Sequence, residues 1–196
     1  IIIGEHGDYP MTEKGQKMYP RRRLFEETFK ALDRLGLKVP VFSDKHLAYD
    51  FDDAQWIYNE LKSRDLPFLG GSSIPLTDYV PEPSQNVLEK AKEILVISYG
   101  GVESYGFHGM EVLQSVAEQR KGGETGVNSI EAIQGKQVYE ALDRGEWSED
   151  LLLAALKANP TWFGEHPRDY ITEPTLFKID YKDGTKAYVI QLQNFV

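Results

Sequence analysis

The sequence predicts an α/β protein in two parts: a partial doubly wound parallel sheet, followed by an α+β domain with a mainly antiparallel sheet. Apolar runs alternate with amphipathic helical patterns over residues 1–70, which is typical of parallel strands joined by right-handed crossovers. The end of the chain has two alternating strands around Asp183-Gly184, a hairpin signal. Because proline and polar residues are concentrated in 74–86, we place the junction there, between domains 1–73 and 87–196.

Three short apolar runs, at 1–3, 39–42 and 68–69, have the composition of strands buried in a parallel sheet. We expect them to be parallel neighbours. Pro20 opens the first intervening helix and Gly36 ends it. The arginine run 21–23 at the start of this helix is interpreted as solvated rather than anion-binding. The second helix begins near Asp50 or Asp52, either of which is placed to cap it.

The composition bounds the class of protein. The chain has 196 residues, of which 41% are hydrophobic and 27% charged, as expected for a globular fold. Its net charge of −9 argues against a nucleic-acid partner, which would require a basic surface. The chain has no cysteine, which excludes disulfides and thiolate chemistry. It has no run long enough to span a membrane, and we expect a cytoplasmic protein.

The first residues read as a buried strand entered midway, without a starting methionine or a signal peptide. We therefore expect this chain to belong to a longer protein. No G-x-G-x-x-G turn occurs in it, so these residues by themselves do not predict nucleotide binding.

Lys45 follows the apolar run 39–42 within a charged cluster. In open α/β sheets, ligands bind beyond the carboxyl ends of the strands. A lysine at such a position can hold an anionic or hydroxylated substrate, and can move a proton if burial lowers its pKa. From position alone, an ordinary surface lysine in a loop is the simpler interpretation.

The turn after the first strand carries Glu5, His6 and Asp8. These side chains have the chemistry of ligands for a hard or borderline cation. Ligands so close together in sequence seldom converge on one ion, so we interpret the segment as a hydrogen-bonded turn and predict no metal.

The second part contains strands at 94–97 and 127–134 and helices at 107–121, 135–143 and 148–159. A two-residue hairpin turn would place six apolar side chains of the last two strands on one face. They are Phe177, Ile179, Tyr181, Tyr188, Ile190 and Leu192. With helices on one side of this sheet, its other face would be free and partly apolar through Leu176, Ala187 and Val189. We therefore expect a homo-oligomer built partly on this sheet.

His108 and Glu111 stand three residues apart at the start of a predicted helix, and so on one face of it. A histidine oriented by a carboxylate is the arrangement that a general acid–base group requires. The pair could equally form half of a metal site, or the histidine could simply be hydrogen-bonded at the helix start.

Two segments carry a family resemblance. Residues 43–48, Ser-Asp-Lys-His-Leu-Ala, resemble the Glu-Lys-Pro-Leu-Ala segment of the glucose–fructose oxidoreductase and inositol dehydrogenase (Gfo/Idh/MocA) superfamily, with Asp44 in place of glutamate and His46 in place of proline. Residues 100–111, Gly-Gly-Val-Glu-Ser-Tyr-Gly-Phe-His-Gly-Met-Glu, resemble its segment Gly-Gly-x-x-x-Asp-x-Gly-x-His-x-x-Asp. Glu111 stands for the usual aspartate, and Tyr105 shifts the pattern by one residue.

The resemblance implies the carboxyl-terminal portion of an NAD(P)-dependent sugar or polyol oxidoreductase. Lys45 and His108 would then be catalytic, lining one pocket and carrying the proton of a substrate hydroxyl, with Glu111 orienting His108. The expected substrate contacts are His6, Asp44 and Tyr105. The expected neighbours of an NAD or NADP cofactor are Glu5, His6 and Lys45.

Two alternatives stay open. One is a non-catalytic relative that binds a ligand or dimerises without the cofactor. The other is a metal-dependent sugar isomerase or hydrolase whose ligands would be Glu5, His6, Asp8, His108 and Glu111.

Overall fold

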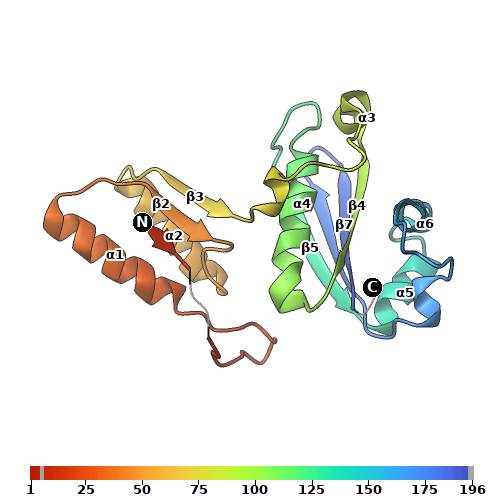
Figure 1. The fold of residues 1–196 in the computed structure, drawn as a ribbon, viewed down its shortest axis with the longest axis horizontal. Helices are drawn as coiled ribbons and strands as arrows, with labels where there is room; N and C mark the ends of the chain where they lie inside the picture. Colours follow the sequence, from red (N-terminus) through yellow and green to blue (C-terminus); the bar gives the residue numbers. More distant parts are fainter. Residues whose placement is uncertain (5–6, 194–196) are drawn as a thin grey trace. The chain divides into compact units, whose positions relative to one another are not determined.

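The computed structural model describes residues 1–4 and 7–193. The chain divides into two compact units, Ile1–Ser72 and Ser73–Val196, which are described separately below (Figure 1). The first contains a three-stranded parallel sheet and the second a four-stranded mixed sheet, each with helices, so the predicted α/β class is confirmed. No helix in the described part of the chain combines the length and the apolar character that crossing a bilayer requires.

The sheet of the first unit consists of β1 (Ile2–Ile3), β2 (Val41–Asp44) and β3 (Phe68–Gly71), in that order. Both pairings are parallel, as predicted. Parallel strands end at the same edge of a sheet. The residues that follow each strand therefore meet at one place, and this edge holds the candidate site.

Helices α1 (Arg21–Leu35) and α2 (Phe51–Ser63) form the core of the first unit together with the sheet. Right-handed crossovers between strands that lie in chain order place both helices on the same face. Gly36 ends α1 with a φ of 64°, in the left-handed region where glycine has no steric penalty. Asp50 caps α2 by accepting from the backbone N–H of Asp52 at 3.0 Å, as predicted.

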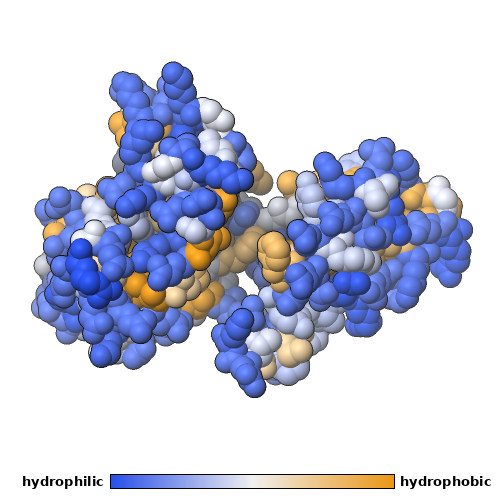
Figure 2. Space-filling view, turned by 180° about the vertical axis from the view of Figure 1, so that it is seen from behind, coloured by the Kyte–Doolittle hydropathy of each residue, from blue (hydrophilic) through white to orange (hydrophobic). Residues whose placement is uncertain are grey.

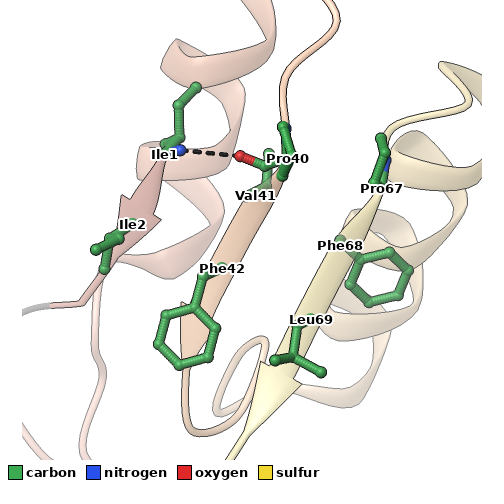
Figure 3. Close-up of a pocket in the computed structure, with 8 residues that line it drawn as sticks. All are labelled: Ile1, Ile2, Pro40, Val41, Phe42, Pro67, Phe68 and Leu69. Carbon is green, nitrogen blue, oxygen red and sulfur yellow. Dashed lines mark hydrogen bonds between the residues drawn. The ribbon is translucent and has the colours of Figure 1, made fainter.

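The opposite face of this sheet is apolar and uncovered within the unit. Ile2 is 78% exposed and Leu69 64% exposed, and the side chains of Ile2, Phe42 and Leu69 are drawn on this face in Figure 3. A hollow of about 450 Å³ lies here, lined by Ile1, Ile2, Pro40, Val41, Phe42, Pro67, Phe68 and Leu69. The side chains that line it are all apolar.

The second unit begins with η1 (Ile74–Leu76), α3 (Gln85–Lys90), β4 (Glu93–Tyr99), η2 (Val102–Gly106) and α4 (Phe107–Ala117). It continues with β5 (Val127–Gln134), α5 (Lys136–Asp143), α6 (Glu149–Ala158), η3 (Pro167–Asp169), β6 (Thr175–Tyr181) and β7 (Lys186–Leu192). The sheet order is β4-β7-β6-β5. Only β4 and β7 are parallel; the other two pairs are antiparallel.

Helices pack against both faces of this sheet. On one face, Leu113 and Ala117 of α4 form a core with Ile179, Ala187 and Val189, among others. On the other face, residues of α5 and α6 form a core with Leu176, Tyr188, Ile190 and Leu192. The expectation of a free face with Leu176, Ala187 and Val189 was wrong, because all three are fully buried within the unit. The homo-oligomer prediction thereby loses the surface on which it was based.

The error comes from the hairpin register. The backbone N–H of Tyr181 donates to the carbonyl of Thr185 at 2.9 Å and that of Gly184 to the carbonyl of Tyr181 at 3.0 Å, while Gly184 has a φ of 83°. The loop therefore has three residues, with glycine at the left-handed position, instead of two. A slip of one residue exchanges the faces of one strand relative to the other.

Hydrophobic residues that stay at the surface are scattered over both units (Figure 2).

Candidate functional site

Three strand ends meet at the carboxyl edge of the parallel sheet. β2 ends at Asp44, and the backbone N–H of the next residue, Lys45, donates to the carbonyl of Gly71 at the end of β3, at 3.0 Å. Gly4 follows β1, and a Cβ on it would lie 3.3 Å from the Cβ of Asp44. A close approach of this kind tolerates no larger side chain without displacement. The edge is therefore tightly built around Asp44 and Lys45.

Lys45 has a strained backbone. Its φ is 69°, and Asp65 is the only other described residue besides glycine with a positive φ. The left-handed conformation costs roughly 1–2 kcal/mol for a residue with a Cβ. Such strain persists where the surroundings over-determine the conformation, and it is concentrated at functional sites. Here the bond to Gly71 fixes the backbone of Lys45.

The side chain of Lys45 lies at the surface of this edge. Its Nζ is 2.9 Å from Oδ2 of Asp44, and the two side chains are 36% and 46% exposed. An ion pair at this exposure contributes little to stability. It does place a proton donor and a hydrogen-bond acceptor side by side, where a hydroxyl group from solution can reach both.

His46, the residue after Lys45, packs against aromatic side chains at the same edge of the sheet. Its ring lies 5.6 Å from the ring of Tyr19, which in turn lies 5.5 Å from that of Tyr9. Burial lowers the pKa of His46, and the positive charge of Arg21 lowers it further. The imidazole is therefore neutral near pH 7.

Arg21 connects three of these segments. It is only 3% exposed, and its Nη1 donates to Oγ of Ser43 at 2.8 Å and to the carbonyl of Ile3 at 3.3 Å. The hydroxyl of Ser43 donates to the carbonyl of His46 at 3.3 Å. The start of α1, the end of β1 and the loop after β2 are thus held in one hydrogen-bonded chain.

The interpretation of the arginine run as solvated was therefore wrong for most of the run. Arg21 is buried, and Arg22 pairs with Glu26 at 2.7 Å and with Asp53 at 2.9 Å. Only Arg23 of the three is exposed. Sequence reasoning missed Arg21 and Ser43 as parts of the site. The one available signal was a cation at a helix start, where the dipole disfavours it.

The second predicted group of residues lies in the other unit. His108 and Glu111 are on α4, and Tyr105 is on η2, a π-helical turn where the sequence had indicated an irregular one. The rings of Tyr105 and His108 are 6.3 Å apart. The structure thus brings Asp44 together with Lys45, and Tyr105 together with His108. That Lys45 and His108 line one pocket, and that Glu111 orients His108, stay predictions.

Glu5 and His6 lie outside the described residues, so their expected contacts with substrate and cofactor, and their part in a metal site, stay predictions. Within residues 1–4 and 7–193, no group of three or more His, Cys, Asp or Glu side chains is arranged to hold a metal ion.

The pKa of His46 gives a pH test of this site. A histidine whose folded pKa is lowered stabilises the fold above its unfolded pKa of about 6.5, and this stability is lost as the pH falls through the folded value. We expect the wild type to lose more unfolding free energy between about pH 7 and about pH 5 than the variant His46→Gln. Denaturant unfolding at the two pH values measures the difference.

The groups that act on His46 are the cations Arg21 and Lys45, which lower its pKa, and the carboxylate of Asp44, which raises it. His166 in the other unit also has a lowered pKa, from burial and from Arg168. Its acid dependence has the same sign and is common to the wild type and His46→Gln. Equal acid dependence of the two proteins would show that His46 is not buried against Arg21.

Comparisons with known proteins come from structure alone. No protein-family model matches this sequence, and no curated protein matches it. Among solved structures, an NAD-binding protein from Listeria innocua is 11% identical with a TM-score of 0.47, covering 90% of this chain and 47% of that one.

Two further structures are inositol dehydrogenases. Scyllo-inositol dehydrogenase from Lactobacillus casei, solved with bound NAD(H) and scyllo-inositol, is 16% identical with a TM-score of 0.46, covering 89% of this chain and 49% of that one. Myo-inositol 2-dehydrogenase from Lactobacillus plantarum is 17% identical with a TM-score of 0.41, at the same two coverages of 89% and 49%. The chain spans about half the length of these structures.

Proposed function

We propose that this chain is part of an NAD(P)-dependent oxidoreductase that acts on a hydroxyl carbon of a sugar or polyol, with Lys45 as the proton-transferring residue. The observation that carries the proposal is the strained backbone of Lys45, with a φ of 69° at the carboxyl edge of a parallel sheet. Ligands of open α/β sheets bind at this edge, and backbone strain marks functional positions.

The chemistry of the edge suits a hydroxyl substrate. The carboxylate of Asp44 can accept a hydrogen bond from a hydroxyl, and the neighbouring Lys45, 2.9 Å from it, can exchange a proton with the same oxygen. Proton transfer of this kind contributes about 10²–10⁴-fold to a rate. Arg21 and Ser43 keep the loop in position. Arg21 donates to the carbonyl of Ile3 and to the hydroxyl of Ser43, which in turn donates to the carbonyl of His46.

The described residues do not supply a complete cofactor site. Dinucleotide pyrophosphates bind at a glycine-rich turn that opens a helix, and this sequence contains no G-x-G-x-x-G. The residues in hand therefore do not fit the phosphate end of NAD or NADP, and we assign to this chain only the proton transfer. The uncovered apolar face with Ile2 and Leu69 supports a larger domain, because parallel sheets are covered on both faces.

His108 and Glu111 are proposed to act on the same substrate as Lys45, with Tyr105, His6 and Asp44 as substrate contacts. Support comes from their positions at the start of α4 and on η2, directly after the carboxyl end of β4. A π-helical turn is rare and is frequent at functional sites.

The test is an assay of the full-length protein with ring sugars and cyclic polyols in the presence of NAD or NADP, following absorbance of the reduced nicotinamide. We expect reduction that depends on both substrate and cofactor, and a much lower rate for His108→Ala. If residues 45 and 108 serve one reaction, the combined variant should be no slower than the slower single one, since groups that act as a unit are not additive.

A non-catalytic ligand-binding relative is the second candidate, favoured for this chain as it stands because these residues contain no G-x-G-x-x-G turn. Binding of a sugar without any binding of NAD or NADP by the full-length protein would support this candidate over the oxidoreductase.

A further inference from the structure

Two exposed tyrosines lie together where β4 ends and the π-helical turn begins. The ring centroids of Tyr99 and Tyr105 are 5.4 Å apart with an interplanar angle of 32°. Tyr99 is 55% exposed and Tyr105 is 42% exposed. Aromatic side chains usually bury their large apolar faces. We call Tyr99 and Tyr105 the tyrosine pair.

The backbone under the tyrosine pair is built to hold it. Gly100 has a φ of 78°, and a Cβ on it would lie 2.6 Å from Cδ2 of Tyr105. The ring of Tyr105 therefore lies directly against the backbone of Gly100, in a position that only glycine permits. The backbone N–H of Tyr105 donates to the carbonyl of Gly101 at 2.9 Å, and this bond also stabilises the turn.

A buried glutamine of the neighbouring strand is hydrogen-bonded to the same loop. Gln191 on β7 is fully buried, and its Nε2 donates to the carbonyl of Tyr99 and, at 2.8 Å, to that of Gly100. Burial of a polar side chain is costly unless it is hydrogen-bonded. Here Nε2 donates to two carbonyls of the loop that carries the pair, which holds the backbone of this loop in place.

Polar groups adjoin this apolar surface. Glu103 is on η2 and His108 on α4, with the imidazole of His108 6.3 Å from the ring of Tyr105. An apolar face beside side chains that accept and donate hydrogen bonds matches a ligand with one C–H face and a rim of hydroxyls. The carboxylate of Glu103 and the net charge of −9 for the chain disfavour a phosphorylated ligand.

We propose that the tyrosine pair is a stacking surface for the C–H face of a ring-form sugar or cyclic polyol. The faces of aromatic rings carry partial negative charge, and the axial C–H bonds of a pyranose present hydrogens with partial positive charge. Contact also removes both apolar surfaces from water. This inference deepens the proposed function and rests on it for the biological role of the ligand, but it makes a binding claim that needs no cofactor.

The experiment measures ligand binding to the full-length protein by saturation-transfer NMR and NMR titration, without nucleotide. The probes are methyl β-D-glucopyranoside, whose equatorial substituents leave axial C–H bonds on each face, and D-glucitol, an open chain. We expect the pyranoside to bind more tightly, with saturation passing to its axial hydrogens. Tyr105→Leu should weaken its affinity about tenfold, the loss of one aromatic contact, and Tyr105→Phe should retain it.

The control is Tyr58 on α2, which is 44% exposed and so matches Tyr105; Tyr58→Leu should leave binding unchanged. Tyr99→Leu is a second variant at a more exposed position, expected to weaken binding in the same direction. The proposal is overturned if the pyranoside does not bind, if Tyr105→Leu and Tyr99→Leu bind it as tightly as Tyr58→Leu does, or if nicotinamide mononucleotide alone shows the dependence on Tyr105.

The two proposals fail separately. Pyranoside binding that depends on Tyr105, in a protein that never reduces NAD or NADP, would sink the oxidoreductase and keep the stacking surface. Turnover that depends on Lys45 but not on the tyrosine pair would do the reverse.

Discussion

Replacing Lys45 by methionine is expected to lower kcat of the full-length protein about 10²–10⁴-fold, the usual contribution of a positioned acid–base group. Methionine keeps the length and the apolar stem of the side chain but cannot exchange a proton. Because the lysine side chain is 36% exposed and its ion pair with Asp44 lies at the surface, the free energy of unfolding should change by less than about 1 kcal/mol. Steady-state kinetics and denaturant unfolding measure the two effects.

Glycine at the same position separates strain from chemistry. Lys45→Gly should lose turnover as methionine does, yet it should unfold at a slightly higher temperature. Relief of roughly 1–2 kcal/mol of left-handed strain exceeds the entropic penalty of glycine, which is about 0.5–1 kcal/mol. Asp65 is the matched control, with a φ of 52°. Asp65→Gly should be stabilised in the same way while its kcat stays at the wild-type value; a stabilised and fully active Lys45→Gly would rule out a functional reason for the strain.

The largest expected effect on stability in the second unit is that of Arg120. Its guanidinium side chain is 3% exposed and lies 3.2 Å from Oδ2 of Asp183. It also donates to the carbonyl of Ala117 at 2.7 Å and to Oγ1 of Thr125 at 3.2 Å, and lies 4.5 Å from the ring centroid of Tyr181. One side chain thus joins the end of α4 to the β6–β7 hairpin.

Arg120→Met should lower the free energy of unfolding by about 1–3 kcal/mol, because it removes a buried guanidinium and leaves the carbonyl of Ala117 and the hydroxyl of Thr125 without their donor. Arg34 in the last turn of α1 is exposed, and Arg34→Met is the control, with an expected change within about 0.5 kcal/mol. Equal effects of the two variants in denaturant unfolding would mean that Arg120 does not hold the hairpin.

Local signals predicted most of the fold. Asp50, Pro20 and Gly36 mark helix ends through hydrogen bonds and backbone angles that depend on a few neighbouring residues. The parallel order of the three short strands follows from their apolar runs and from the crossover rule. The helix ends depend on a few neighbouring residues, and the strand order follows from a general rule of chain topology, so both could be predicted without the structure.

The hairpin register and the buried Arg21 depend on tertiary structure and were not predicted. Asp183-Gly184 suits a two-residue turn as well as a three-residue loop with Gly184 left-handed, and the packing of both sheet faces against helices selects the latter. Arg21 is buried because Ser43 and the carbonyl of Ile3 accept from it. These partners come from other strands, which an apolar pattern along one helix cannot reveal.

The grouping of side chains at the carboxyl edge of the sheet was predicted in part, for the same reason. Lys45 and Asp44 were selected as candidates because a charged cluster directly follows an apolar run, and their roles stay predictions. The strain at Lys45 and the support from Gly71 and Ser43 appear only when the strands are paired. The aromatic contact between Tyr99 and Tyr105 likewise requires the π-helical turn, which no regular spacing of side chains announces.

The most direct test of the central claim is chemical rescue of the variant Lys45→Ala in the full-length protein. Truncation removes the amine and leaves room for a small one from solution, so methylamine should restore part of the lost kcat, with better rescue by amines of matching basicity. A kcat for Lys45→Ala equal to that of the wild type, with or without methylamine, would show that Lys45 transfers no proton and would contradict the account.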